Sequence, residues 1–329
     1  MFKILSFAVF FLVAFSSLAQ YTETINSNRP GFSYGAYSVG TNVIQGEMGF
    51  RYGNDEHDLL NREKDIFDVD YSLRYGLYYE RLEILLDGTY ASENVMISRG
   101  LSSDEFSNRN FRRNTLGAKY LIYDRYLQKE LEGPNVISWK AENTFQWDDL
   151  IPSVSAYAGA NLLFGDNPFK FQEEPFLSPR LGIITQNNYK NWVFVMNFIA
   201  DKFTTDFPSY EGIFTLTHTI SPDIALFTEF QFIINDLYSD EIVRAGAGYL
   251  LFDDLQLDAS FMVNFRDTPA RWYVGLGVSY RYDDLHEGKR IFKNKVEKQD
   301  AKRKKKIEKK KKELNPDVEE LKDEPGNRK

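Results

Sequence analysis

Residue types that commonly act in catalysis are scarce in this chain. It has no cysteine and three histidines, His57, His218 and His286. The absence of cysteine excludes disulfides, thiolate metal sites and cysteine nucleophiles. A Ser-His-acid site needs a histidine that accepts the proton of the nucleophile, and none of these histidines is paired at a spacing typical of metal ligands. We therefore expect a protein that is not an enzyme and that holds no metal or cofactor.

Charged side chains are abundant instead, and many occupy alternate positions of apolar segments. Such groups pair with one another in a polar network that fixes strand register, or they line a path in which their charge tunes selectivity. Both hypotheses remain open for each residue. The candidate lumen-lining residues are Glu47, Arg74, Glu83, Glu229, Arg244, Asp258 and Arg281.

The elements that must position these groups are β-strands. Between Asp65 and Glu80, alternate residues from Phe67 to Tyr79 are apolar, whereas Asp68 and its alternate neighbours are mostly polar. Successive side chains of a strand point to opposite faces, so a repeated aromatic-rich face indicates a barrel surrounded by lipid. A soluble β-sandwich also alternates, but its strands are typically about 5–6 residues long. We predict an all-β fold, a transmembrane outer-membrane antiparallel β-barrel.

About twelve segments are long enough for tilted membrane strands, which need about 9–11 residues. They are residues 41–52, 66–78, 82–92, 113–124, 152–165, 177–187, 192–203, 210–220, 224–235, 241–251, 255–265 and 271–282. Tight turns alternate with polar loops at 53–65, 93–112 and 166–176, as expected for short periplasmic turns and longer outer loops.

An even number of strands places both termini on the periplasmic side. Residues 136–147 also alternate and would form a thirteenth strand, which would break this rule. We assign residues 125–150 to a long periplasmic connection that includes a short interfacial helix.

The ends of the chain have their own character. Lys3, the apolar run that follows it and Ser17-Leu18-Ala19 predict a signal peptide, residues 1–19. The remaining chain divides into an N-terminal segment (20–40), a barrel (41–285) and a tail (286–329). The tail has 17 Lys and Arg against 10 Asp and Glu, although the whole chain carries a net charge of −8. Such a run is usually a solvated helix or a disordered arm. In the periplasm it could contact anionic cell-wall polymers, and we expect no nucleic-acid partner.

Several short motifs resemble those of one family. They are Arg29-Pro30-Gly31-Phe32-Ser33, Gln45-x-Glu47-x-Gly49, Leu73-Arg74-Tyr75-Gly76-Leu77 followed by Arg81-Leu82-Glu83, Leu226-Phe227-Thr228-Glu229, Leu255-Gln256-Leu257-Asp258 and Gly275-x-Gly277-x-Ser279-Tyr280-Arg281. With these motifs in this order, the chain resembles the outer-membrane transporters grouped as the MetA-pathway phenol-degradation family. The resemblance implies a bacterial outer-membrane barrel that moves small, often hydrophobic, compounds. Asn28 stands where relatives commonly have an acidic residue.

The N-terminal segment is long enough to enter the lumen from the periplasm. We expect a plug that contains Arg29, Pro30 and Gly31, with Arg29 paired to a carboxylate such as Glu47 or Glu83. An extension across the barrel mouth is the other interpretation.

A barrel of twelve strands has a lumen between the filled eight-stranded case and the open porins of about 16–18 strands. We predict a monomeric, porin-like channel or transporter for small molecules, hydrophobic ones included, with outer-membrane lipid and an unknown small-molecule substrate as partners. The alternative is a closed structural or adhesion barrel that acts through its outer loops.

Overall fold

The computed structural model describes residues 25–132, 147–170, 174–236 and 238–286 of the 329-residue chain. All of them belong to the first of two compact units, residues 1–287. The signal peptide, the basic tail apart from His286, and the candidate thirteenth strand apart from Trp147 lie outside the described residues.

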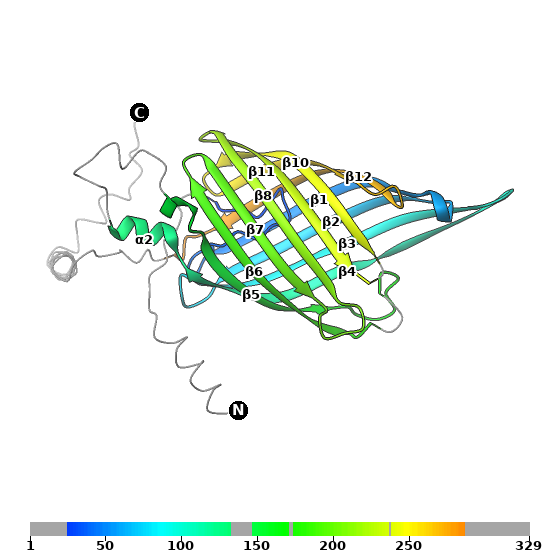
Figure 1. The fold of residues 1–329 in the computed structure, drawn as a ribbon, viewed down its shortest axis with the longest axis horizontal. Coiled ribbons are helices and arrows are strands. Elements are labelled where there is room, and N and C mark those ends of the chain that lie inside the picture. The colour runs from blue at the N-terminus through cyan, green and yellow to red at the C-terminus, as the bar shows by residue number, and fades with distance from the viewer. Residues whose placement is uncertain (1–24, 133–146, 171–173, 237, 287–329) are drawn as a thin grey trace, which may run out of the picture. The chain divides into compact units, whose positions relative to one another are not determined.

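The described part of the chain forms a closed antiparallel barrel, which confirms the predicted fold class (Figure 1). Each strand pairs with the next in sequence, and β1 pairs with β12 to close the barrel. The strands are β1 (Ile44–His57), β2 (Arg62–Gly76), β3 (Leu82–Arg99), β4 (Ser102–Tyr123), β5 (Ser153–Leu162), β6 (Leu177–Tyr189), β7 (Trp192–Asp201), β8 (Ser209–Ser221), β9 (Ile224–Asn235), β10 (Ser239–Phe252), β11 (Leu255–Asn264) and β12 (Ala270–Tyr282).

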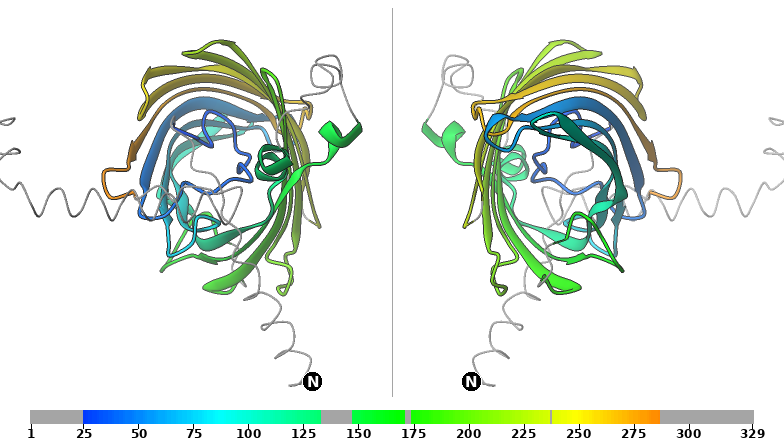
Figure 2. Two further views of the ribbon diagram at one scale, coloured as in Figure 1. Left: turned by 90° about the vertical axis from the view of Figure 1, so that its left-hand side faces the viewer. Right: turned by 90° about the vertical axis from the view of Figure 1, so that its right-hand side faces the viewer.

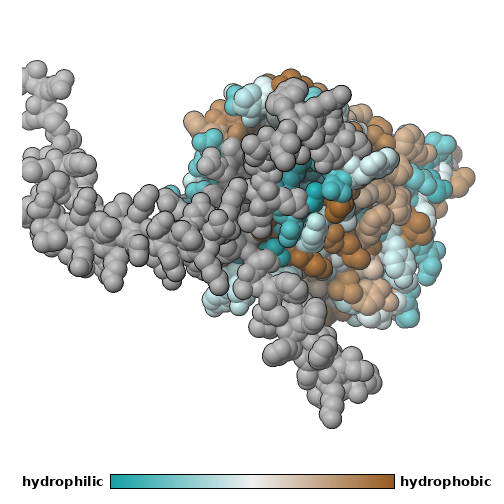
Figure 3. All heavy atoms as spheres, turned by 60° about the vertical axis from the view of Figure 1, so that its left-hand side comes forward, coloured by the Kyte–Doolittle hydropathy of each residue, from teal (hydrophilic) through white to brown (hydrophobic). Residues whose placement is uncertain are grey.

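The alternation of side chains explains why this sequence closes into a barrel. On β2, Phe67 and Leu73 are exposed on the outer surface, whereas Asp68 and Arg74 are fully buried inside. Figure 3 shows the apolar residues of the outer surface in brown. A closed barrel pairs every strand edge, which a lipid environment requires. No helix in the described ranges is long and apolar enough to cross a membrane.

Two of the predicted outer loops are wrong. The ladder between β1 and β2 continues to the pair His57–Arg62, with only a short 3-10 helix, η1 (Asp58–Leu60), at its tip. Similarly, β3 and β4 pair as far as Arg99–Ser102. Residues 53–65 and 93–112 are therefore mostly strand. Outside lipid the outward positions no longer need apolar side chains, so the hydrophobic alternation ends before the hydrogen-bond ladder does.

Residues 125–150 are not needed to close the barrel. The chain forms helix α2 (Arg125–Glu132) after β4, and a 3-10 helix, η2 (Trp147–Leu150), precedes β5. β4 then pairs directly with β5. The start of β1 and the end of β12 meet at the pair Ile44–Tyr282, so both ends of the barrel chain lie at one end of the molecule.

The outward position of Phe230 gives the first testable prediction. Phe230 lies near the middle of β9 and is exposed, whereas the neighbouring Gln231 is buried and donates to Glu211 (3.3 Å). We expect Phe230→Arg to lower the free energy of unfolding by about 2–4 kcal/mol, because it places a charge near the bilayer midplane. Gln231→Arg, which faces the lumen beside Glu211, should cost less. Urea unfolding in lipid vesicles measures both, and equal costs would contradict a lipid-facing surface at Phe230.

A candidate functional site inside the lumen

Residues 25–43, named here the lumen segment, run inside the barrel (Figure 2, dark blue). The segment is not a strand, so its backbone N–H and C=O groups are not paired in the hydrogen-bond ladder of the sheet. Buried backbone groups must nevertheless find hydrogen-bond partners. Side chains from the inner wall of the barrel provide many of them.

Carboxylates and amides of the wall accept hydrogen bonds from N–H groups of the lumen segment. Three of these carboxylates belong to predicted lumen-lining residues. The bonds are Asn28 N to Glu47 Oε1 (3.2 Å), Phe32 N and Ser33 N to Glu229 Oε2 (2.9 and 3.2 Å), Tyr34 N to Asn197 Oδ1 (2.6 Å), Ala36 N to Gln186 Oε1 (2.9 Å) and Val39 N to Glu83 Oε2 (2.9 Å).

Wall side chains also donate to the carbonyl groups of the lumen segment. The donors are cationic groups, amides and a serine hydroxyl. The bonds are Arg74 to Asn26 O (2.8 Å), Gln256 to Arg29 O (3.1 Å), Asn197 to Tyr34 O (2.9 Å), Lys119 to Gly35 O and Tyr37 O (2.5 and 2.9 Å) and Ser155 to Ala36 O (2.5 Å). Asn197 thus binds both backbone groups of Tyr34.

Arg29 anchors the segment to a carboxylate other than the expected ones. Its Nε and Nη2 atoms donate to Asp258, each at 3.0 Å, and neither Glu47 nor Glu83 is its partner in these bonds. Gly49 and Gly277, which pair across β1 and β12, make room for the guanidinium group. A Cβ atom at either glycine would overlap Arg29. The two glycines therefore form a recess that determines where Arg29 can lie.

Phe32 and Gly31 of the lumen segment also contact charged residues of the barrel wall. The Phe32 ring lies 4.3 Å from Arg244 Cζ and 5.0 Å from Arg51 Cζ, which are cation–π distances. Arg244 donates to Glu229 (2.9 Å), which also receives the backbone bonds of the segment. At Gly31 a Cβ would lie 2.5 Å from Glu229 Oε2, so a side chain at this position would displace the carboxylate.

A buried apolar cluster also packs against the lumen segment. Tyr34 stacks on Tyr157 with ring centroids 5.4 Å apart. Both rings belong to a buried cluster that otherwise consists of Ala36, Leu85, Leu121, Ile184, Ile199 and Ile213. Apolar packing thus acts together with hydrogen bonds on this part of the lumen segment, since Tyr34 and Ala36 also bond to polar groups of the wall.

Glu83 is the centre of the most deeply buried ion cluster. It accepts from Arg74 (3.1 Å) and Lys119 (2.8 Å), and all three side chains are essentially inaccessible to water. A buried charge is tolerated when it is paired and hydrogen-bonded. Because Arg74 and Lys119 also bind segment carbonyls, the lumen segment completes this cluster.

Arg281 is the predicted site residue that lies apart. It is near the end of β12 and pairs with Asp283 (3.2 Å). It lines a hollow at the end of the barrel together with the acidic turn residues Asp223, Asp253 and Asp254.

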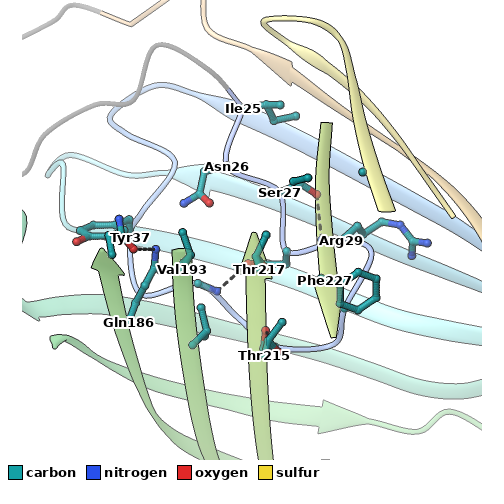
Figure 4. Close-up of a pocket in the computed structure, with 18 of the residues that line it drawn as sticks. Ile25, Asn26, Ser27, Arg29, Tyr37, Gln186, Val193, Thr215, Thr217 and Phe227 are labelled. Atoms are coloured by element: carbon teal, nitrogen blue, oxygen red, sulfur yellow. Dashed lines mark hydrogen bonds between the residues drawn. The ribbon is translucent and has the colours of Figure 1, made fainter. Parts of the chain in front are cut away.

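A cavity of about 770 Å³ lies between the lumen segment and the wall of β6 to β11 (Figure 4). The strand residues that line it are uncharged. They are Gln186, Asn188, Val193, Val195, Thr215, Thr217, Thr219, Ala225, Phe227, Gly248 and Gln256. The charged residues of the lining are Arg29, which Asp258 neutralises, and Asp124 at the end of β4. Tyr37 of the segment also lines the cavity, and burial raises the pKa of its phenol to about 12. A phenol is uncharged at neutral pH even at its ordinary pKa, so Tyr37 adds no charge to the cavity.

A much smaller void of about 70 Å³ lies between the lumen segment and the wall of β1 to β4. Asn28, Arg29 and Gly31 line both the void and the cavity. The segment thus separates the two spaces.

One motif in the segment was not recognised in the sequence. Gly31-Phe32-Ser33-Tyr34-Gly35 matches the Gly-x-Ser-x-Gly pattern of serine hydrolases, which belongs to a strand–turn–helix. Here it is an extended stretch, and the Ser33 hydroxyl lies 2.7 Å from that of Thr215. None of the histidines pairs with it: His57 ends β1, His218 stacks on Trp192, and His286 bonds Thr41 O. The described ranges also contain no cluster of side chains suited to a metal ion.

Sequence reasoning also missed two neutral residues that hold the segment, Asn197 and Gln186. A signal for Asn197 is present in β7, where an amide stands at an inward position between the inward apolar residues Val195 and Ile199. For Gln186 we find no comparable signal.

The fold and this interior define an outer-membrane β-barrel with an occupied lumen. The chain belongs to the family described as "Putative MetA-pathway of phenol degradation", whose model matches residues 27–282. No curated protein matches the chain by sequence.

Three solved structures illustrate the similarity of fold. The COG4313 outer membrane channel from Pseudomonas putida F1 is 9% identical over 78% of this chain and 100% of that chain, with a TM-score of 0.49. The NanC porin is 9% identical over 71% and 98%, with a TM-score of 0.44. A TodX deletion mutant, titled a monoaromatic hydrocarbon channel, is 9% identical over 74% and 90%, with a TM-score of 0.41. Similarity at this level identifies no function.

Glu229 provides a test of how the segment is held. We expect Glu229→Gln to speed amide hydrogen exchange at Phe32 and Ser33 roughly tenfold to hundredfold, because hydrogen bonds to a charged group contribute about 1.5–3 kcal/mol. Exchange measured by mass spectrometry checks this. Glu241→Gln, on an exposed carboxylate of β10, is the matched control. Unchanged exchange at Phe32 and Ser33 would show that the wall carboxylate does not hold the segment.

Proposed function

We propose that this protein is an outer-membrane channel for small molecules and that its own N-terminal segment controls the lumen. The observation that carries the proposal is the attachment of the lumen segment to side chains from many strands, through hydrogen bonds to charged and polar groups and through apolar packing. A barrel whose interior served only as a hydrophobic core would need no segment outside its strands to fill it. Release of the segment would leave a polar lumen of twelve strands, wide enough for water.

The cavity beside the segment supports small, uncharged and partly apolar substrates. Its strand wall combines apolar side chains such as Val195 and Phe227 with the hydroxyl groups of Thr215, Thr217 and Thr219. Binding sites for small molecules are mostly apolar, with a few polar groups that orient the ligand. The family description, which refers to phenol degradation, agrees with a compound of this kind.

The orientation that we propose places the chain termini and the cavity at the periplasmic end. The short turns 190–191, 222–223 and 253–254 lie at this end, and the long paired extensions of β1 to β4, which include the short turn 100–101, lie at the other. Short turns on the periplasmic side are the rule for such barrels. Contact of the basic tail with anionic cell-wall polymers stays a prediction.

Conductance tests the channel directly. We expect deletion of residues 21–37 to raise the single-channel conductance of the purified protein in a planar bilayer, because the lumen segment no longer fills the lumen. Cells that carry the deletion should become more sensitive to hydrophobic antibiotics. Arg29→Gln, which removes the bidentate pair with Asp258 but keeps the segment, should increase the frequency of openings.

The control for this experiment is Arg99→Gln at the tip of β3, where the side chain is exposed and far along the sequence from the lumen segment. Heat-modifiable mobility in gels verifies that each variant is folded. Folded proteins that never conduct, with or without the segment, would contradict a channel and favour a closed barrel that acts through the extensions of β1 to β4.

Cysteine labelling tests the orientation, since the natural chain has no cysteine. Ser103 and Asn191 are both exposed, at opposite ends of the barrel. In intact cells, an impermeant thiol reagent should label Ser103→Cys but not Asn191→Cys, and both should react after lysis. Labelling of Asn191→Cys alone in intact cells would reverse the orientation.

A further inference from the structure

Three apolar side chains close together in the sequence are exposed near the end of the barrel where β1 begins and β12 ends. Trp147 is 82% exposed, Leu150 55% and Ile151 43%. They belong to η2 and to the link between η2 and β5. Exposed apolar groups that gather in one place mark a surface that contacts another molecule or a membrane.

The position of η2 shows which neighbour this surface can meet. Asn187 of β6 donates from Nδ2 to Leu150 O (2.9 Å). Asn187 stands on the same face of β6 as Leu181 and Ile183, which are exposed on the outer surface of the barrel. The hydrogen bond therefore attaches η2 to the outward side of β6, not to the barrel mouth.

The same level of the barrel carries an aromatic girdle. Trp192, the first residue of β7, is exposed outward and stacks on His218 at 4.1 Å. It pairs with Tyr189, two residues beyond Asn187. Trp and Tyr gather where lipid headgroups meet the acyl chains. Because Asn187 holds η2 beside this girdle, Trp147 lies close to the edge of the lipid belt.

We propose that Trp147, Leu150 and Ile151 form an interfacial patch that inserts into the headgroup–acyl boundary of the adjacent membrane leaflet. The indole ring has an apolar body and an N–H donor, which suit this boundary. Of the two acidic residues of η2, Asp149 pairs with Lys129 of α2 (2.8 Å), and Asp148 is exposed to water. The patch itself consists of uncharged side chains, so its partner is the phospholipid boundary.

Tryptophan fluorescence tests the proposal in reconstituted protein. A chain with Trp147 as its single tryptophan is obtained with Trp139→Phe, Trp192→Phe and Trp272→Phe. In phosphatidylcholine vesicles, lipid brominated near the headgroup end of its acyl chains should quench Trp147 more strongly than lipid brominated at the chain ends, and aqueous iodide should quench it weakly. Strong iodide quenching without lipid quenching would overturn the proposal, as would protection from both quenchers, which would indicate a protein partner.

Two control chains calibrate the depth. A chain with only Trp192 reports the girdle, and Leu59→Trp in an otherwise tryptophan-free chain reports the exposed tip of β1 and β2. Trp147 should resemble Trp192 and differ from the residue at position 59. If the multiple replacements prevent folding, the difference in quenching between the natural chain and Trp147→Phe gives the same readout.

Discussion

The structure depends on the requirement that buried backbone polar groups find hydrogen-bond partners. The barrel meets this requirement for its own strands through the closed ladder. The lumen segment has no ladder, so wall side chains must replace it. This explains why carboxylates such as Glu47, Glu83 and Glu229 point inward: they are acceptors for N–H groups as well as partners for cations. The ionic lumen and the segment are thus one interdependent arrangement.

This dependence also explains the small residues and the strength of the attachment. Gly49 and Gly277 leave the space that Arg29 fills, and Gly31 permits the approach to Glu229. Removal of one partner from a buried ion pair costs about 3–5 kcal/mol, because it leaves an uncompensated charge. Movement of the segment as a whole would instead let water enter and solvate the exposed groups together. Under the proposed function, a segment held through many polar contacts can be released into water without unfolding of the barrel.

Much of the fold could be predicted from the sequence because lipid imposes strict alternation. The twelve strands and the inward position of residues such as Asp258 follow from it. The limits of β1 to β4 were missed, since beyond the lipid only strand pairing, and not hydrophobicity, marks a strand. The partner of Arg29 was also missed. Asp258 lies 229 positions away in the sequence, and only closure of β12 onto β1 brings its neighbourhood to Arg29. Asn197 was not predicted because the search for lumen-lining residues relied on charged side chains, and Asn197 is a neutral amide in an otherwise apolar strand.

The most direct test of the central claim is to lock the lumen segment to the wall. The Ser33 and Thr215 hydroxyls lie 2.7 Å apart, which makes these positions the pair to replace with cysteines for a cross-link in a chain that has no other cysteine. The measurement is the single-channel conductance of the Ser33→Cys/Thr215→Cys protein under oxidising and reducing conditions. We expect the oxidised protein to stay closed and the reduced protein to open as the natural chain does. Openings of equal size and frequency in both states would contradict control of the lumen by the segment.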